Sequence, residues 1–133
     1  MIRIVPLLLV VPLAAFAGKT EREFVKTRLA PAIKKSEATF KKACGCNWKL
    51  AVGKKLENDL DALHVAEHLV GIIGDNAAGY CTDDASKKAL CAISTFSMET
   101  GETTGFSVEG KVGKAVLSGG YPPWDNITAA LDK

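Results

Sequence analysis

The amino-acid sequence predicts an α+β fold, and three observations support that prediction. Apolar residues recur at helical spacing in two long stretches, over residues 20–43 and 56–81. Between residues 90 and 118, apolar and polar residues alternate as they do in β-strands. Four cysteines are spread over the same part of the chain. We therefore expect a kinked N-terminal helix and a central helix packed on a small three-stranded antiparallel meander, with a short C-terminal helix and two disulfides.

Residues 1–17 are predicted to be a secretory signal that is cleaved from the fold. Arg3 supplies a positive charge, residues 4–11 are apolar, and the stretch ends at Ala17 in the small-x-small pattern that signal peptidase cuts. The apolar run is shorter than the roughly 20 residues that a membrane span needs. We expect residues 18–133 to form a single exported domain, periplasmic or secreted, with no later membrane span.

All four cysteines lie after the predicted signal: Cys44, Cys46, Cys81 and Cys91. An even number in an oxidising compartment favours two disulfides, for which three pairings exist. A bond between Cys44 and Cys46 would close a very small, strained ring, so we favour bonds from these two to Cys81 and Cys91. Either such pairing ties the end of the first helix to the end of the central one, and each bridge should stabilise the fold by roughly 2–4 kcal/mol. The alternative is a redox pair at Cys44 and Cys46, but it would follow a helix C-terminus, where the helix dipole raises a thiol pKa.

The first helix is expected over residues 20–43. Its apolar stripe is formed by Val25, Leu29, Ile33, Phe40 and Cys44. Pro31 lies inside this helix, where a proline removes one hydrogen bond and clashes with the carbonyl four residues earlier. We expect a kink or break at residues 27–31.

Charge is divided unevenly along the chain. Residues 19–55 hold 11 Lys and Arg against 3 Asp and Glu, whereas residues 56–133 hold 5 against 12. The two parts either complement each other within the fold or leave an anion-seeking face on the first part. Two lysine pairs, Lys34-Lys35 and Lys41-Lys42, lie seven residues apart and so share one side of the helix. That side is either simply solvated or binds an anionic surface, such as phospholipid headgroups or a cell-wall polymer. The overall balance of +2 gives no support to nucleic-acid binding.

The central helix is the element on which the others are expected to pack. Its apolar positions form two strips, Leu56, Leu60, Leu63, Ala66, Val70, Ile73 and Ala77 on one side and Val65, Leu69 and Ile72 on the other. A helix that is apolar on two sides is usually covered by other elements. Gly71 and Gly74 would be explained by a helix or strand that crosses closely over them.

The remaining elements are shorter. Residues 48–52 alternate in a way that fits a short strand, and residues 90–118 are interpreted as the three-stranded antiparallel meander, with a tight hairpin at Glu109-Gly110. Pro123 is well placed as the first residue of a C-terminal helix, because its missing N–H is not needed there. The apolar stripe of that helix is Trp124, Ile127 and Leu131.

Between the two apolar strips of the central helix runs a polar line that includes Asp61, His64 and His68. These three side chains have the spacing to bind zinc or copper on one helix face. In the alternative interpretation no metal is bound, and the carboxylates of the line pair with the imidazoles on a solvated strip. The string from His64 to His68 also reads H-x-x-E-H and resembles the zinc motif of the inverzincin peptidases. That resemblance implies a zinc hydrolase, with a third ligand drawn from Glu99, Glu102 or Glu109.

The sequence holds no nucleophile elbow, phosphate loop or dinucleotide fingerprint. We therefore expect a small exported, non-catalytic binding protein of the inhibitor, immunity or chaperone kind, acting on a protein or an anionic envelope component. The alternative is a metal-binding protein or zinc-dependent hydrolase that uses the helix face of His64 and His68. Candidate contacts are the lysines of the two pairs and four aromatic residues that either anchor a partner or fill the core. These are Trp48, Tyr80, Tyr121, Trp124, Lys34, Lys35, Lys41 and Lys42.

Overall fold

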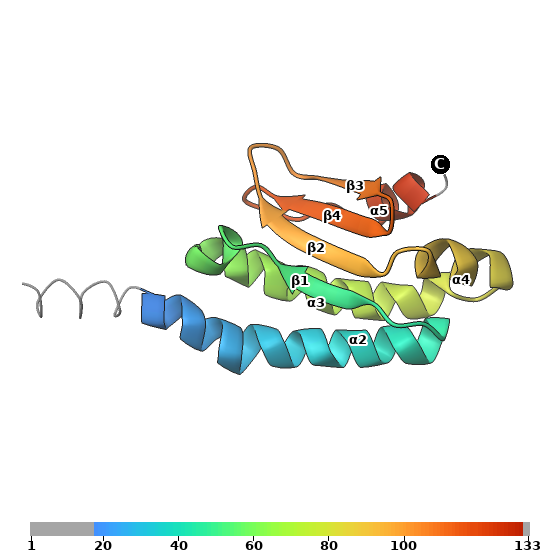
Figure 1. Ribbon diagram of the computed structural model, residues 1–133, viewed down its shortest axis with the longest axis horizontal. Coiled ribbons are helices and arrows are strands. Elements are labelled where there is room, and N and C mark those ends of the chain that lie inside the picture. Colours follow the sequence, from blue (N-terminus) through green and yellow to red (C-terminus); the bar gives the residue numbers. More distant parts are fainter. Residues whose placement is uncertain (1–17, 132–133) are drawn as a thin grey trace, which may run out of the picture.

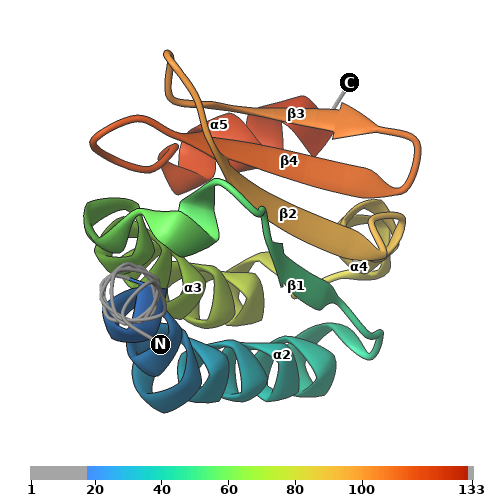
Figure 2. The same ribbon diagram turned by 60° about the vertical axis from the view of Figure 1, so that its left-hand side comes forward.

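The structure is a computed structural model that describes residues 18–131, so the predicted signal lies outside the described residues. A long N-terminal helix runs from residue 18 through a π-helical turn, Val25–Leu29, into α2, Ala30–Cys44. The elements that follow are β1 (Lys49–Val52), a 3-10 turn (Leu56–Asn58), α3 (Leu60–Tyr80), α4 (Asp84–Cys91), β2 (Thr95–Thr100), β3 (Gly105–Glu109), β4 (Val112–Leu117) and α5 (Trp124–Leu131). Helices α3 and α5 pack on one face of the sheet, and α2 lies along α3 beside β1 (Figures 1 and 2). The predicted α+β class is confirmed.

The sheet differs from the predicted three-stranded antiparallel meander. It has four strands in the order β1-β2-β4-β3, and only β3 and β4 are antiparallel. Strand β1 joins as a parallel neighbour of β2, because the chain crosses back along α3 and α4 before it forms β2. Strand β4 lies between β2 and β3 and is parallel to β2. The sheet is therefore mixed. The three strands predicted within residues 90–118 are present, and the short strand predicted at residues 48–52 joins them as β1, but the predicted meander order and the antiparallel pairing of β2 were wrong.

Burial explains why β4 and not β3 is the inner strand. Alternate residues of β4, namely Gly113, Ala115 and Leu117, are buried, whereas no residue of β3 is fully buried. Gly113 leaves a space over β4 in which rings from its two neighbouring strands meet. Phe96 of β2 and Phe106 of β3 stack there with ring centroids 5.3 Å apart. A Cβ at Gly113 would come within 2.8 Å of the Phe106 ring, so glycine lets this ring pack closely over β4.

Pro31 disturbs the first helix without ending it. The π-helical turn closes just before the proline, and the Ala30 N–H donates to the carbonyl of Val25. The predicted kink or break thus takes the form of one widened turn, after which the helix continues to Cys44. Gly45 then ends the helix with a left-handed backbone conformation (φ 78°) that favours glycine, and its N–H donates to the Lys41 carbonyl.

The central helix begins four residues later than predicted. Asp59 caps it by accepting a hydrogen bond from the Ala62 N–H at 3.1 Å, and Leu56 lies in the 3-10 turn before it. Both predicted apolar strips face protein: the residues of the first are buried except for the half-buried Leu60, and in the second Leu69 is buried while Val65 and Ile72 are half-buried. Helix α2 crosses α3 at Gly74, where a Cβ would lie 2.9 Å from the Ser36 hydroxyl. The predicted close crossing is therefore present at Gly74, while Gly71 faces open space.

Both disulfides have the favoured pairing of the first two cysteines with the last two. They join Cys44 to Cys81 and Cys46 to Cys91. All four sulfurs lie where α2, α3 and α4 end, so one end of the helical layer is covalently tied. Two disulfides are consistent with an oxidising compartment outside the cytoplasm. Among residues 18–131, no helix is long and apolar enough to cross a membrane.

Candidate functional site

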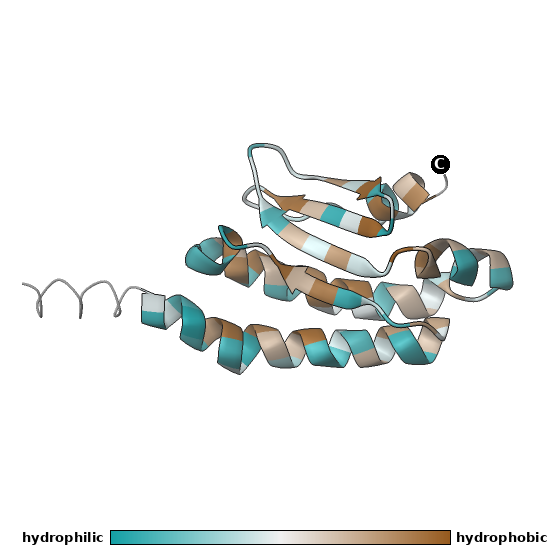
Figure 3. Ribbon diagram, viewed as in Figure 1, coloured by the Kyte–Doolittle hydropathy of each residue, from teal (hydrophilic) through white to brown (hydrophobic). Residues whose placement is uncertain are grey.

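The outer side of α2 carries the four lysines that the sequence singled out. Lys34, Lys35, Lys41 and Lys42 are all exposed, and we call them the lysine face. The apolar side of the same helix is directed into the core, where Ser36, Phe40 and Cys44 are buried. Figure 3 shows hydrophilic and hydrophobic residues alternating along α2, as in an amphipathic helix. The two lysine pairs are seven residues apart, so the lysine face extends over about two helical turns.

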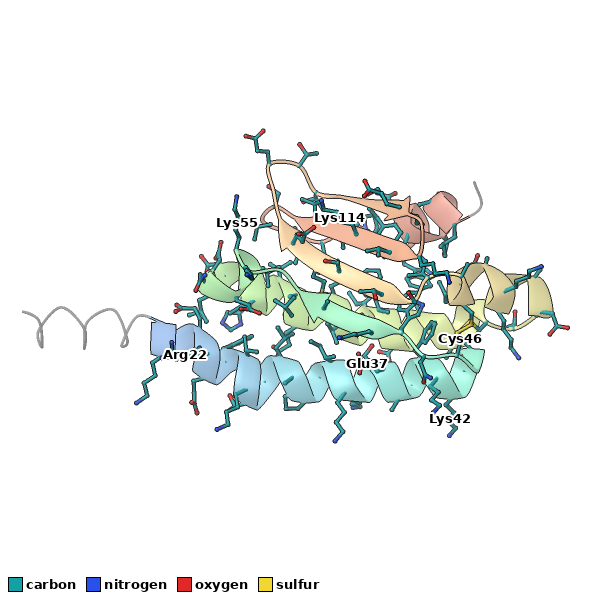
Figure 4. All side chains as sticks on the ribbon, viewed as in Figure 1. Arg22, Glu37, Lys42, Cys46, Lys55 and Lys114 are labelled. Carbon is teal, nitrogen blue, oxygen red and sulfur yellow. A yellow bond between two sulfur atoms is a disulfide. The ribbon has the colours of Figure 1, made fainter. Side chains whose placement is uncertain are left out.

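The single carboxylate of α2 does not belong to the lysine face. Glu37 is half-buried and accepts a hydrogen bond from the Leu50 N–H of β1 at 2.8 Å. Figure 4 shows Glu37 between α2 and the sheet, while Lys42 points away from the molecule. Glu37 therefore closes the edge of β1 and leaves the positive charge of the lysine face uncompensated within the helix.

No acidic side chain from another element pairs with the lysine face either. In the part of the chain that the structure describes, Arg28 pairs with Glu67 and Lys114 with Glu99, and neither pair includes a lysine of the lysine face. The charge asymmetry in the sequence is thus not neutralised by contacts at this helix. The lysine face is a solvent-facing cationic surface without insertable apolar residues, because the apolar stripe of α2 is buried against α3.

The H-x-x-E-H string lies on the amino-terminal half of α3, where its members have separate contacts. Glu67 binds Arg28 through two hydrogen bonds, Nε to Oε2 at 3.1 Å and Nη2 to Oε1 at 2.9 Å. The His64 ring packs edge-on against Phe24 with centroids 4.5 Å apart, and Arg28 lies over the same phenyl ring. These contacts hold the first helix to α3. Glu67 is therefore occupied as a structural ion-pair partner.

Asp61, His64 and His68 are exposed on α3, but the structure does not bring them together as a three-ligand group. Within residues 18–131, no three His, Cys, Asp or Glu side chains are arranged to hold a metal ion. Of the acidic residues considered as further ligands, Glu99 is paired with Lys114 at 3.2 Å. Binding of zinc or copper at this helix face stays a prediction, with no geometric support in the described residues.

The four candidate aromatic contacts divide between core and surface. Trp48 is buried, stacks between Phe40 and Phe96, and donates its indole N–H to the Leu90 carbonyl at 3.0 Å. It fills the core and is not available to a partner. Tyr80 and Trp124 are half-buried and meet edge-to-face where α3 ends and α5 begins. Tyr121 is the exposed member of the set.

Sequence reasoning missed one basic feature. A cleft of about 590 Å³ lies between residues 53–56 and the sheet, and its lining includes Lys54, Lys55, Glu99 and Lys114. The run Gly53-Lys54-Lys55 was visible in the sequence, but nothing in its spacing relates it to Lys114, which comes from β4. Figure 4 shows Lys55 and Lys114 on the same side of the molecule, far from the lysine face.

Comparisons of this chain with models of protein families, with curated proteins and with solved structures find no match.

Proposed function

We propose that this chain is a small exported binding protein whose lysine face engages an anionic component of the cell envelope. The observation that carries the proposal is a set of four exposed lysines on one helix side, with no carboxylate paired to them among the described residues. The two disulfides support a location outside the cytoplasm, periplasmic or secreted.

The binding that this surface supports is electrostatic. An amphipathic helix that enters a membrane presents apolar residues to the acyl chains, whereas α2 directs its apolar residues into the protein core. Lysine ammonium groups near an anionic membrane surface contribute about 1 kcal/mol each, and salt screens that attraction. The lysine face is therefore suited to adsorb at the level of headgroups or on an anionic polymer without insertion.

A non-catalytic role fits the chemistry that the fold brings together. All four cysteines of the chain are in disulfides, so the protein has no free thiol nucleophile. Both histidines are exposed on α3, and the adjacent Glu67 is held by Arg28. Replacing His64 and His68 by alanine should leave anion binding unchanged, whereas a metal-dependent activity would be lost in that variant.

The test is co-sedimentation of residues 18–133 with vesicles that contain phosphatidylglycerol, with phosphatidylcholine vesicles as the neutral control. A variant with all four lysines of the lysine face replaced by glutamine should bind the anionic vesicles more weakly by about 4 kcal/mol, nearly a thousandfold. The matched control replaces Lys54, Lys55, Lys87 and Lys88 by glutamine, which removes the same charge from other surfaces. Equal losses in the two variants would show that net charge, and not the lysine face, determines binding.

A further inference from the structure

The two edges of the sheet are treated differently in this fold. Exposed edge strands are prone to pair with other chains, and proteins usually block them with charges, prolines, bulges or covering elements. At one edge, β1 is only four residues long and its Leu50 N–H is occupied by the Glu37 carboxylate. At the other edge, β3 is the outermost strand (Figure 2).

Strand β3 has fewer of these protections. Its sequence is Gly-Phe-Ser-Val-Glu, with no proline or lysine and with one charged residue, Glu109. Helix α5 packs against this strand. Within residues 18–131, the residues of β3 form no hydrogen bond outside their ladder with β4. Val108, near the end of this strand, is one of the few large apolar side chains that the fold leaves exposed, at 37%.

The hairpin geometry indicates which backbone groups of β3 face outward. Glu109 and Val112 flank the two-residue turn Gly110-Lys111, which Gly110 enters with a φ of 61°. Residues that flank such a turn form a hydrogen-bonded pair, and hydrogen-bonded and non-hydrogen-bonded pairs alternate along an antiparallel ladder. The N–H and C=O groups of Phe106 and Val108 are therefore directed away from β4.

We propose that β3 is a dimerisation edge that pairs with β3 of a second copy of this chain, antiparallel and centred on Ser107. In this register Phe106 and Val108 of one copy lie opposite Val108 and Phe106 of the other, so the outward backbone groups satisfy one another. The aromatic–β-branched pairs that result are among the favourable cross-strand pairs. Glu109 lies opposite Gly105 of the second copy, so no like charges are brought together.

A second copy is the occupant that this edge fits, because the strand is complementary to itself in both backbone and side chains. Pairing extends the four-stranded sheet to eight strands with both sets of helices on one side, since the two-fold axis is perpendicular to the sheet. The lysine faces lie beside β1, at the far ends of this extended sheet, so dimerisation leaves them open.

The test is sedimentation equilibrium of residues 18–133 from micromolar to millimolar concentration, with variants at the centre of the register. Ser107→Lys and Ser107→Glu each place like charges directly opposite each other and should raise the dimer dissociation constant up to about fivefold. An equimolar mixture of the two variants should restore association, because lysine then faces glutamate. Ser107 is exposed but lies opposite Lys114 of its own hairpin, so circular dichroism and a urea midpoint check that both variants keep the fold before their association is compared.

Val112→Lys is the matched control, since Val112 is exposed on β4 rather than at the edge and lies opposite Glu109 of its own hairpin. This variant should dimerise as the unmodified chain does. A monomer at every concentration, or a mixture of the Ser107 variants that associates no better than either alone, would overturn the proposal. Loss of the dimer in the Val112 variant would also overturn it, by locating the contact on the sheet face.

Discussion

Replacing Gly74 by alanine should destabilise the protein, although alanine is the better helix former. Gly74 lies inside α3 where α2 crosses it, and a Cβ there would meet the Ser36 side-chain oxygen at 2.9 Å and the Ser36 Cα at 3.3 Å. Ser36 belongs to α2, which the disulfide between Cys44 and Cys81 ties to the end of α3. The Ser36 backbone can therefore make room for a methyl group only if α2 moves relative to α3. Gly71, three residues earlier on α3, has no heavy atom within 4 Å of the same built position.

The magnitude follows from two opposing effects. Glycine-to-alanine substitution in a helix interior gains about 0.8–1 kcal/mol, and overpacking a tight contact costs about 1–3 kcal/mol. Gly74→Ala should therefore lose about 1 kcal/mol net, whereas Gly71→Ala should gain nearly 1 kcal/mol, because only the first effect acts there. The two variants should thus differ by about 2 kcal/mol with opposite signs relative to the unmodified protein.

Urea denaturation with the disulfides intact measures this difference, provided that the slope with denaturant stays constant among the variants. Ser36→Ala offers a second check. The Ser36 hydroxyl is buried and has no hydrogen-bond partner among the described residues, so its removal should stabilise the fold and relieve part of the Gly74→Ala penalty. The reasoning is refuted if Gly74→Ala is as stable as Gly71→Ala, because the crossing would then tolerate a methyl group.

Three further predictions concern the sheet, the disulfides and one helix cap. Gly113→Ala should lower stability by about 1–3 kcal/mol, seen as a lower urea midpoint, because the new methyl group displaces the stacked Phe106 ring. Reduction of both disulfides should cost about 4 kcal/mol for each closed loop, seen as a lower melting temperature in strong reductant. Hydrogen bonds from the Ser86 backbone N–H and then its hydroxyl lower the pKa of Asp83 below its ordinary value of 3.8. The stabilisation by Asp83 is therefore complete above that value and lost as pH falls through the lowered pKa, so acid titration of Asp83→Asn should show a smaller loss of stability than the unmodified protein.

The helices were predictable because their signals are local. The apolar spacing of α3 and the lysine pairs of α2 are read directly from neighbouring turns, and the structure places both as expected. The start of α3 was missed because the apolar spacing already begins at Leu56, which lies in a 3-10 turn before the helix. The helix itself begins after Asp59, whose side chain caps it. That the first two cysteines bond to the last two was predictable because ring strain removes one of three pairings, but the sequence did not choose between the two that remain.

The strand order was not predictable because it depends on contacts between distant residues. Strand β4 is an inner strand in which Gly113 makes room for rings from β2 and β3. The alternation of residues within one strand does not indicate which strands will lie on either side of it. The same limit applies to the polar line of α3. Helical spacing grouped His64 with Asp61 and His68, but the contacts that hold His64 and Glu67 in the structure, Phe24 and Arg28, come from another helix.

Both disulfides lie at one end of the helical layer, so the helices can separate more easily at the other end. The carboxyl ends of the first helix and α3 are covalently joined through Cys44 and Cys81, whereas their amino ends are held by Arg28 with Glu67 and by Phe24 with His64. Thermal fraying therefore starts at residues 18–29, and a protease should find its first cutting sites there. The disulfide between Cys44 and Cys81 keeps the two helices in register while their amino ends are open. The frayed turns can therefore form their native contacts again without a search for the correct alignment.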